Sequence, residues 1–280
     1  MSTTALAPRE ETTTRKAPPH AGGQRVTFPR IVHMEWIKLR SLRSTLYTLA
    51  VTVVLVIGVG LILSSVVGTG SGPDREDFGD PTSITLSGVP LAALAIAVLG
   101  VLMSAGEYAT GTIRATLAAV PARLPVLWGK AVVFAAVSFV LMSAAALGAF
   151  LAGQPVLSAN GMDTAALSDP GVLRALVGAA VYLTGAGLIG LAVGALLRNS
   201  AGAITLVVGA LFLVPGLVEL LPGTWNDAIG PYLPSNAANA FMTVQTESGA
   251  LSPGPGLAVF VCYIAALLAG AAVLLKRRDA

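Results

Sequence analysis

Side chains able to catalyse a reaction are scarce in this sequence of 280 residues. Both histidines, His20 and His33, precede the first long apolar run, and no His-Glu-x-x-His motif or Cys-His pairing occurs. The single Gly-Lys pair, Gly129-Lys130, lacks the upstream glycine and the following Ser or Thr of a phosphate-binding loop. The sequence therefore predicts that the chain is not an enzyme and has no catalytic, cofactor-binding or metal-binding residue. Without such a loop the chain is not expected to hydrolyse ATP itself.

The sequence does contain two segments suited to contact a membrane surface or a partner protein. The first lies at residues 31–44. Read as a helix, this segment places Val32, Trp36 and Leu39 on one side, although Glu35 and Arg43 intrude on that side. A tryptophan with flanking basic residues suits the headgroup layer of a membrane. We expect an amphipathic helix that either only anchors the chain to lipid or also contacts a cytoplasmic partner.

The second contact segment is the polar stretch between the second and third apolar runs. Ile113, Leu117 and Val120 share one helical side, and Pro121 would end the helix. A stretch of about 25 residues is longer than a simple connection requires. An apolar helix side on the face of a membrane protein favours a partner protein over burial in lipid.

The composition indicates that apolar helices position both segments. Of the residues, 55% are hydrophobic and only 11% are charged, and the mean hydropathy is +0.79. A soluble domain carries about 25% charged residues, so this composition excludes a cytosolic enzyme. It also excludes a disordered protein. Six runs have the length of a membrane span: 46–67, 84–105, 131–152, 172–197, 201–221 and 257–275. We predict an all-α integral membrane protein with six transmembrane helices, an amphipathic N-terminal interface helix and a short amphipathic helix on the cytoplasmic face.

The distribution of charge predicts the orientation of these spans. With a cytoplasmic N-terminus, fifteen of the 17 Lys and Arg residues lie on the inner side, as the positive-inside rule requires. Both termini are then cytoplasmic, in a multi-pass protein of the plasma membrane. Residues 1–30, rich in Thr, Pro and charge, are expected to form a disordered cytoplasmic tail, and 31–280 a six-span transmembrane domain.

Several features within or next to the spans have two readings. Arg174 and Glu219, the only charged residues inside the six runs, lie near span ends as interface residues that could pair. The Gly190-x-x-x-Gly194 motif is either a close helix contact or a point where the span bends. Pro215 predicts a kink in the fifth run. Residues 222–256 form either short external or re-entrant helices or a surface loop with aromatic anchors.

The two contact segments together resemble a known family. Residues Glu35 to Ser41 before the first span, and Gly106 to Arg114 with their Glu-x-x-x-Gly-Thr pattern after the second, look like the permease subunit of ATP-binding cassette transporters of the type-2 exporter class. The resemblance covers about residues 30–278 and includes the six-span layout.

That resemblance implies an interface helix at 31–44 and a coupling helix near 109–120, both in contact with a cytoplasmic ATPase subunit. The interface residues are Glu35, Trp36, Lys38, Arg40 and Arg43. The residues implied to couple to the ATPase are Glu107, Gly111, Thr112, Ile113, Arg114 and Leu117.

The function implied is export of a hydrophobic or amphipathic substrate, driven by ATP that the partner ATPase binds with Mg and hydrolyses. The implied partners are that ATPase, a second permease copy in a homodimer or heterodimer, and membrane lipid, but no nucleic acid. The alternatives are a stand-alone secondary carrier and a membrane anchor or sensor that transports nothing.

Overall fold

The computed structural model describes residues 27–69, 79–111, 123–245 and 249–277. These residues are mostly helical and include no strand, which confirms the predicted all-α fold class. Six helices are long and apolar enough to cross a membrane, as expected of a multi-pass membrane protein. The elements are α1 (Phe28–Ser41), α2 (Arg43–Thr69), α3 (Pro81–Thr85), α4 (Val89–Ala109), α6 (Arg123–Ala159), α7 (Val172–Leu197), α8 (Ser200–Val208), η2 (Gly209–Leu213), α9 (Val214–Glu219), α10 (Gly223–Ile229), η3 (Gly230–Tyr232), α11 (Pro234–Met242) and α12 (Pro253–Arg277).

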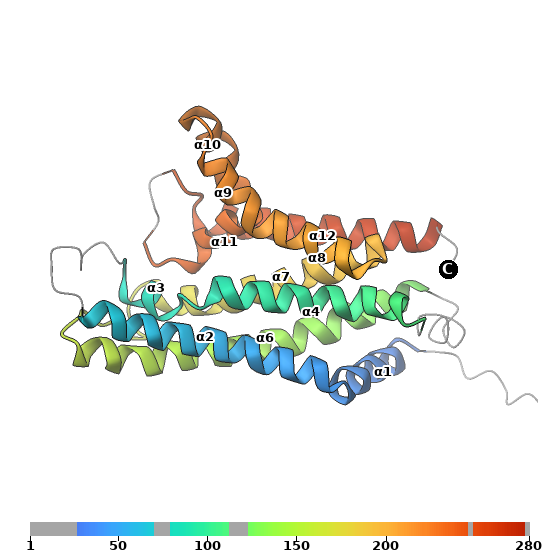
Figure 1. Cartoon of the computed structure of the whole chain (residues 1–280), viewed down its shortest axis with the longest axis horizontal. Coiled ribbons are helices and arrows are strands. Elements are labelled where there is room, and N and C mark those ends of the chain that lie inside the picture. Colours follow the sequence, from blue (N-terminus) through green and yellow to red (C-terminus); the bar gives the residue numbers. More distant parts are fainter. Residues whose placement is uncertain (1–26, 70–78, 112–122, 246–248, 278–280) are drawn as a thin grey trace, which may run out of the picture.

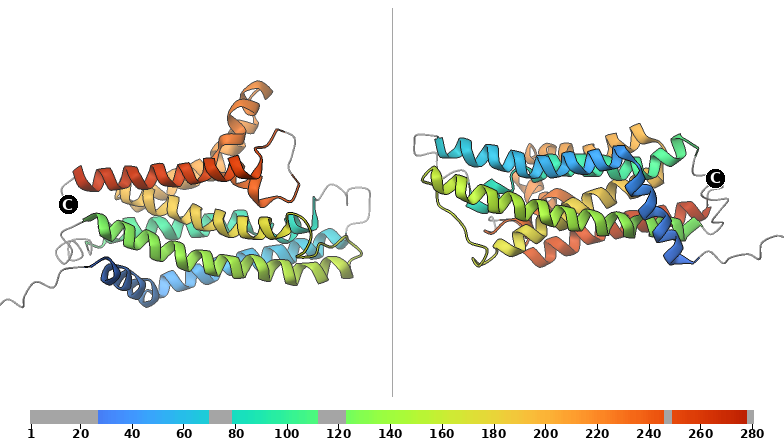
Figure 2. Two further views of the ribbon diagram at one scale, coloured as in Figure 1. Left: turned by 180° about the vertical axis from the view of Figure 1, so that it is seen from behind. Right: turned by 90° about the horizontal axis from the view of Figure 1, so that it is seen from below.

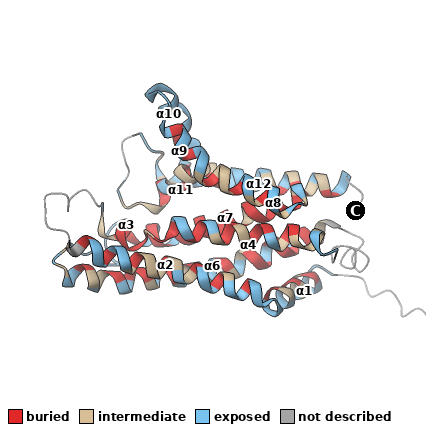
Figure 3. Cartoon of the chain, viewed as in Figure 1, coloured by how far each residue is buried: buried red, intermediate tan, exposed pale blue. Residues whose placement is uncertain are grey.

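The long helices run side by side in alternating directions, as Figure 1 shows. We call the end of the bundle that carries α1 the α1 end; the C-terminal ends of α4 and α12 lie there too. Helix α1 itself crosses the bundle obliquely at this end, as the right-hand view of Figure 2 shows. Helix α7 is central and contacts α4, α6, α8, α11 and α12. Buried residues follow α4 and α7 in Figure 3, whereas α9 and α10 are largely exposed.

Glycines bring α4 and α7 into direct backbone contact. A Cβ atom at Gly190 would meet the carbonyl oxygen of Ala97, and one at Gly100 would meet that of Gly187. Small residues permit such close approach between helices in a membrane. Of the two readings of the Gly190-x-x-x-Gly194 motif, the structure supports close contact, and α7 continues through it without a break.

The sequence predicted one continuous helix from residue 84 for the second apolar run, and the structure differs. The chain makes a short helix, α3, then turns over 86–88, and α4 begins at Val89. Two features explain the break. Pro90 starts a helix readily but disrupts a helix interior, and Gly88 lies directly against the backbone of α2 at Leu55 and Val56, where a side chain would not fit.

The fifth apolar run bends away from the bundle. A π-helical segment, Gly209–Leu213, separates α8 from α9, and Pro215 lies in the first turn of α9. Proline has no backbone N–H to donate to the preceding turn, so the regular hydrogen-bond ladder is interrupted at this point. The kink predicted at Pro215 is therefore present, with its π-helical turn just before the proline. Beyond it α9 and α10 project from the bundle, as Figure 1 shows.

Three other segments differ from the sequence-based bounds. The interface helix ends at Ser41 rather than 44, because Leu42 adopts an extended conformation and α2 begins at Arg43. Helix α6 begins at Arg123, eight residues before the predicted span, so it includes Lys130. Between the fifth and sixth spans, the structure forms short helices, α10, η3 and α11, rather than only a loop.

Candidate functional site

Helix α1 docks on the first turns of α6 through a small apolar contact. Ile31 is almost fully buried and packs with Val126, and its side chain lies against Gly129. The buried positions of α1 are Ile31, Glu35 and Leu39, spaced four residues apart on one side of the helix. This side overlaps the one expected from the sequence, since it contains Leu39 and the intruding Glu35, but Trp36 is exposed. The buried side of α1 therefore has a carboxylate at its centre.

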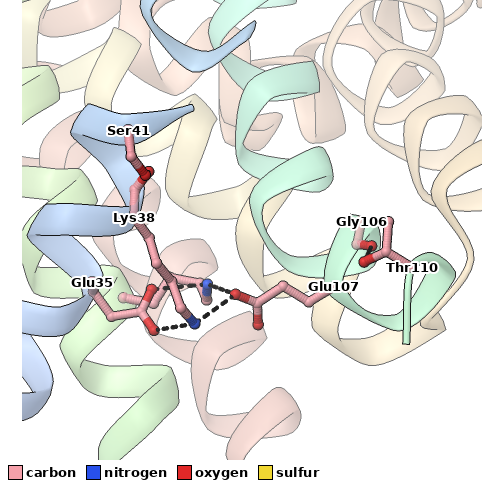
Figure 4. Close-up of polar contacts among 7 residues, drawn as sticks. Glu35, Lys38, Ser41, Gly106, Glu107 and Thr110 are labelled. Atoms are coloured by element: carbon pink, nitrogen blue, oxygen red, sulfur yellow. Dashed lines mark hydrogen bonds and ion pairs between the residues drawn. The ribbon is translucent and has the colours of Figure 1, made fainter. Parts of the chain in front are cut away.

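Four charged side chains meet where α1, α4 and α6 converge, and we call Glu35, Lys38, Glu107 and Lys130 the charge cluster (Figure 4). The ammonium of Lys130 donates to Glu35 Oε2 at 3.0 Å and to Glu107 Oε1 at 2.8 Å. That of Lys38 donates to Glu35 Oε1 at 3.2 Å and to Glu107 Oε1 at 3.1 Å. Charges of opposite sign thus alternate around a closed ring whose formal net charge is zero.

Burial makes the four charges of the ring costly in free energy unless they are paired. The exposed fraction of the side chain is 0% for Glu35, 6% for Lys130 and 15% for Glu107, but 32% for Lys38. Removing a charge from water is costly unless an opposite charge and hydrogen bonds compensate for it. Each lysine here bonds both carboxylates, so the ring compensates all four charges only while the three helices stay together. Its geometry therefore fixes α1 to the last turn of α4 and the start of α6.

The charge of Lys38 is stabilised by its two partners. Burial by itself lowers the pKa of Lys38, but the negative charges of Glu35 and Glu107, together with the hydrogen bonds that they accept, outweigh burial. The pKa of Lys38 consequently lies above its ordinary value of 10.5.

The raised pKa of Lys38 predicts how stability depends on pH. A lysine whose pKa is higher in the folded state stabilises that state fully below its unfolded pKa, and this contribution disappears as the pH rises through the folded pKa. We expect Lys38→Met to lower the free energy of unfolding by about 1 kcal/mol near neutral pH. The difference from the natural protein should persist to about pH 10 and vanish above the raised pKa. Thermal unfolding of both proteins from neutral to strongly alkaline pH measures it; a difference that disappears below pH 9 would contradict the assignment.

The structure brings together only some of the residues expected to be functional. Glu35, Lys38 and Glu107 join the charge cluster, whereas Trp36, Arg40 and Arg43 are exposed on or beside α1. Gly111 follows the end of α4 with a φ of 71°, a conformation that favours glycine. The described part of the expected coupling helix is the end of α4, and Thr112, Ile113, Arg114 and Leu117 lie outside the described residues.

Lys130 is the member of the cluster that the sequence-based prediction missed. It lies at the edge of an apolar run, where a lysine is ordinary as an orientation signal. Its partners Glu35 and Glu107 are 95 and 23 residues away in sequence, so no local pattern links them. The available signal was that Glu35 and Glu107 are the only acidic residues of the two stretches 31–45 and 106–130, which otherwise carry basic residues.

The opposite end of the bundle uses its charges differently. The pairing considered for Arg174 and Glu219 does not occur. Arg174 instead donates to the carbonyl oxygens of Thr243 and Val244 at 2.9 and 3.1 Å, which ties the segment after α11 to the start of α7. Glu219 lines an open cavity of about 260 Å³ with residues of α10 and α11. Among the residues that the structure describes, no three His, Cys, Asp or Glu side chains are placed to hold a metal ion.

No protein-family model matches the chain, and no curated protein shows significant similarity to it.

Proposed function

We propose that this chain is the membrane-spanning permease subunit of an ATP-binding cassette transporter of the type-2 exporter class. It would export a hydrophobic or amphipathic substrate, using ATP hydrolysed by a separate cytoplasmic subunit. The observation that carries the proposal is the charge cluster. It joins the two segments on which the family resemblance rests, through Glu35 and Lys38 in one and Glu107 in the other.

The cluster supports a specific mechanical role in this proposal. An ATPase dimer that closes on ATP would push the segment near 109–120 and the interface helix α1. Because ion pairs hold α1 to α4 and α6, the three helices would shift as one body rather than bend separately. Such a shift would open the path between two permease copies to alternate sides of the membrane.

The uncovered surface of the bundle suits lipid and a second permease copy. Large apolar side chains are exposed along α2, α9 and α12, among them Val54, Leu217 and Val261. A hydrocarbon environment covers such faces without cost, and a second copy in a homodimer or heterodimer would cover part of them.

Purification from native membranes tests the proposal. We expect a tagged full-length chain to recover an ATP-binding protein in equal amounts, and Arg114→Glu to reduce that recovery at least about tenfold, which corresponds to about 1.4 kcal/mol. Lys276→Glu is the matched control. It reverses a charge exposed on α12, at the α1 end, and should leave recovery unchanged.

Two results would contradict the proposal. Transport by the purified chain in liposomes under a proton gradient, with no ATPase present, would favour a secondary carrier. Recovery of signalling proteins without any ATP-binding protein would favour an anchor or sensor.

A further inference from the structure

The turn between α7 and α8 has an unusual backbone conformation. Only Arg198 and Asn199 separate the two helices, and Arg198 has φ 54° and ψ 16°. Among the described residues it is the one residue other than glycine with a positive φ. Glycine would adopt this left-handed conformation with less strain. An arginine there points to a role for its side chain.

The side chain of Arg198 reaches the last turn of α4. Its guanidinium carbon lies 5.0 Å from the centre of the Tyr108 ring, within the range of a cation–π interaction. Tyr108 directly follows Glu107 of the charge cluster. One turn of α4 therefore contacts α1 and α6 through Glu107, and the α7–α8 turn through Tyr108.

Helix α8 is the anchored part of the fifth span. The side chain of Asn199 accepts a hydrogen bond from the backbone N–H of Gly202 at 2.9 Å and caps the helix, which packs against α4 and α7. Beyond it the span leaves the bundle: Leu213, Leu217 and Leu220 are 63%, 62% and 81% exposed. Apart from contacts of η2 with α11 and of α9 with η3 and α10, the position of η2 and α9 depends on how α8 is held.

We propose that the contact between Tyr108 and Arg198 is a latch that fixes the start of the fifth span to the last turn of α4. Arg198 is a positioning residue in this arrangement. A displacement of α4 and the charge cluster then reaches α9 through the latch and α8. The ATP-dependent part of this inference rests on the proposed function, whereas the latch itself does not.

A distance measurement on the full chain without any ATPase tests the latch. Spin labels are placed on the natural Cys262, which is exposed on α12, and on Leu217→Cys in α9. The labelled protein is diluted with unlabelled chain carrying Cys262→Ala, so that only distances within one chain are read. We expect a single narrow distance distribution in the natural background.

Matched substitutions separate the side chain from the backbone. Arg198→Gly keeps the left-handed turn, with less strain, but removes the guanidinium. Tyr108→Leu removes the aromatic ring. Each substitution should widen the distance distribution at least about twofold. Tyr108→Phe keeps the ring face and should leave the distribution narrow. If the distance distributions of both Arg198→Gly and Tyr108→Leu are as narrow as that of the natural protein, the proposal is overturned and Arg198 is only a helix boundary.

A second arm adds the co-purified ATPase and ATP. We expect the distance between the labels to shift in the natural background, and Arg198→Gly to lose the shift while ATP hydrolysis continues. A shift that Arg198→Gly leaves intact would overturn the transmission role. If no ATPase co-purifies, the proposed function is wrong. The widths of the distance distributions measured without ATPase still show whether the latch exists.

Discussion

Glu35→Gln is expected to lower the free energy of unfolding by about 3 kcal/mol. The substitution keeps the shape of the side chain but removes a negative charge that is fully buried and bonded to two lysines. Of its two partners among the described residues, Lys130, which is 6% exposed, then keeps only Glu107. A buried charge that loses part of its compensation is costly because water cannot replace the lost partner. Unfolding of the purified chain in detergent measures the loss.

A double substitution shows whether the cost comes from the pair. Lys130→Met alone should also destabilise the protein, because within the charge cluster it leaves Glu35 with only Lys38. Combining it with Glu35→Gln should cost at least about 1 kcal/mol less than the sum of the two single effects. Glu219→Gln is the matched control, since this exposed carboxylate lies outside the cluster, and its effect should stay within about 0.5 kcal/mol. Additive single effects would show that Glu35 and Lys130 are not coupled.

Gly190→Ala is expected to destabilise the bundle by about 2–3 kcal/mol, because one added methyl group would separate α4 from α7. The new Cβ would meet the backbone at the Ala97 carbonyl oxygen and, at 3.2 Å, at Val101 N. Backbone atoms cannot move aside as the end of a side chain can, so the two helices must shift apart. The same unfolding measurement in detergent applies.

Gly58→Ala is the control for this substitution, because it introduces the same methyl group in the middle of α2. The nearest atom to a Cβ there is a side-chain methyl of Val54 at 4.0 Å. We expect no loss of stability, and a gain of up to about 1 kcal/mol from the higher helix propensity of alanine. Equal effects at the two positions would contradict the close contact between α4 and α7.

The sequence predicted the parts of this fold that depend on local composition. Runs of about 20 apolar residues are sufficient to indicate six helices, and Pro215 is sufficient to indicate a bend. The break before α4 was missed although Pro90 is a local signal for it; its second cause is tertiary, since Gly88 lies against the backbone of α2. The length of α6 was missed for a different reason, since its first turns continue past the apolar run and carry Lys130.

The candidate site was predicted residue by residue but not as a cluster. Glu35, Lys38 and Glu107 each stood out beside an apolar run, yet their pairing depends on how α1 crosses the bundle. Helical periodicity placed Trp36 and Leu39 on one apolar side of α1 and treated Glu35 as an intruder on that side, because tryptophan is apolar and glutamate is not. In the structure the pairing with Lys130 makes burial of Glu35 possible, so the carboxylate side faces the bundle and Trp36 is exposed.

Photo-crosslinking in native membranes tests the central claim most directly, namely that an ATPase drives this chain from the side of the membrane that the α1 end faces. A photoreactive residue at position 117, within the expected coupling segment, should form an adduct with an ATP-binding protein. The same residue at position 217, exposed on α9, should not. An adduct with an ATP-binding protein at 117 alone is the predicted result. Absence of any such adduct at 117, or labelling of 117 by a reagent confined to the outside of the cell, would contradict the account.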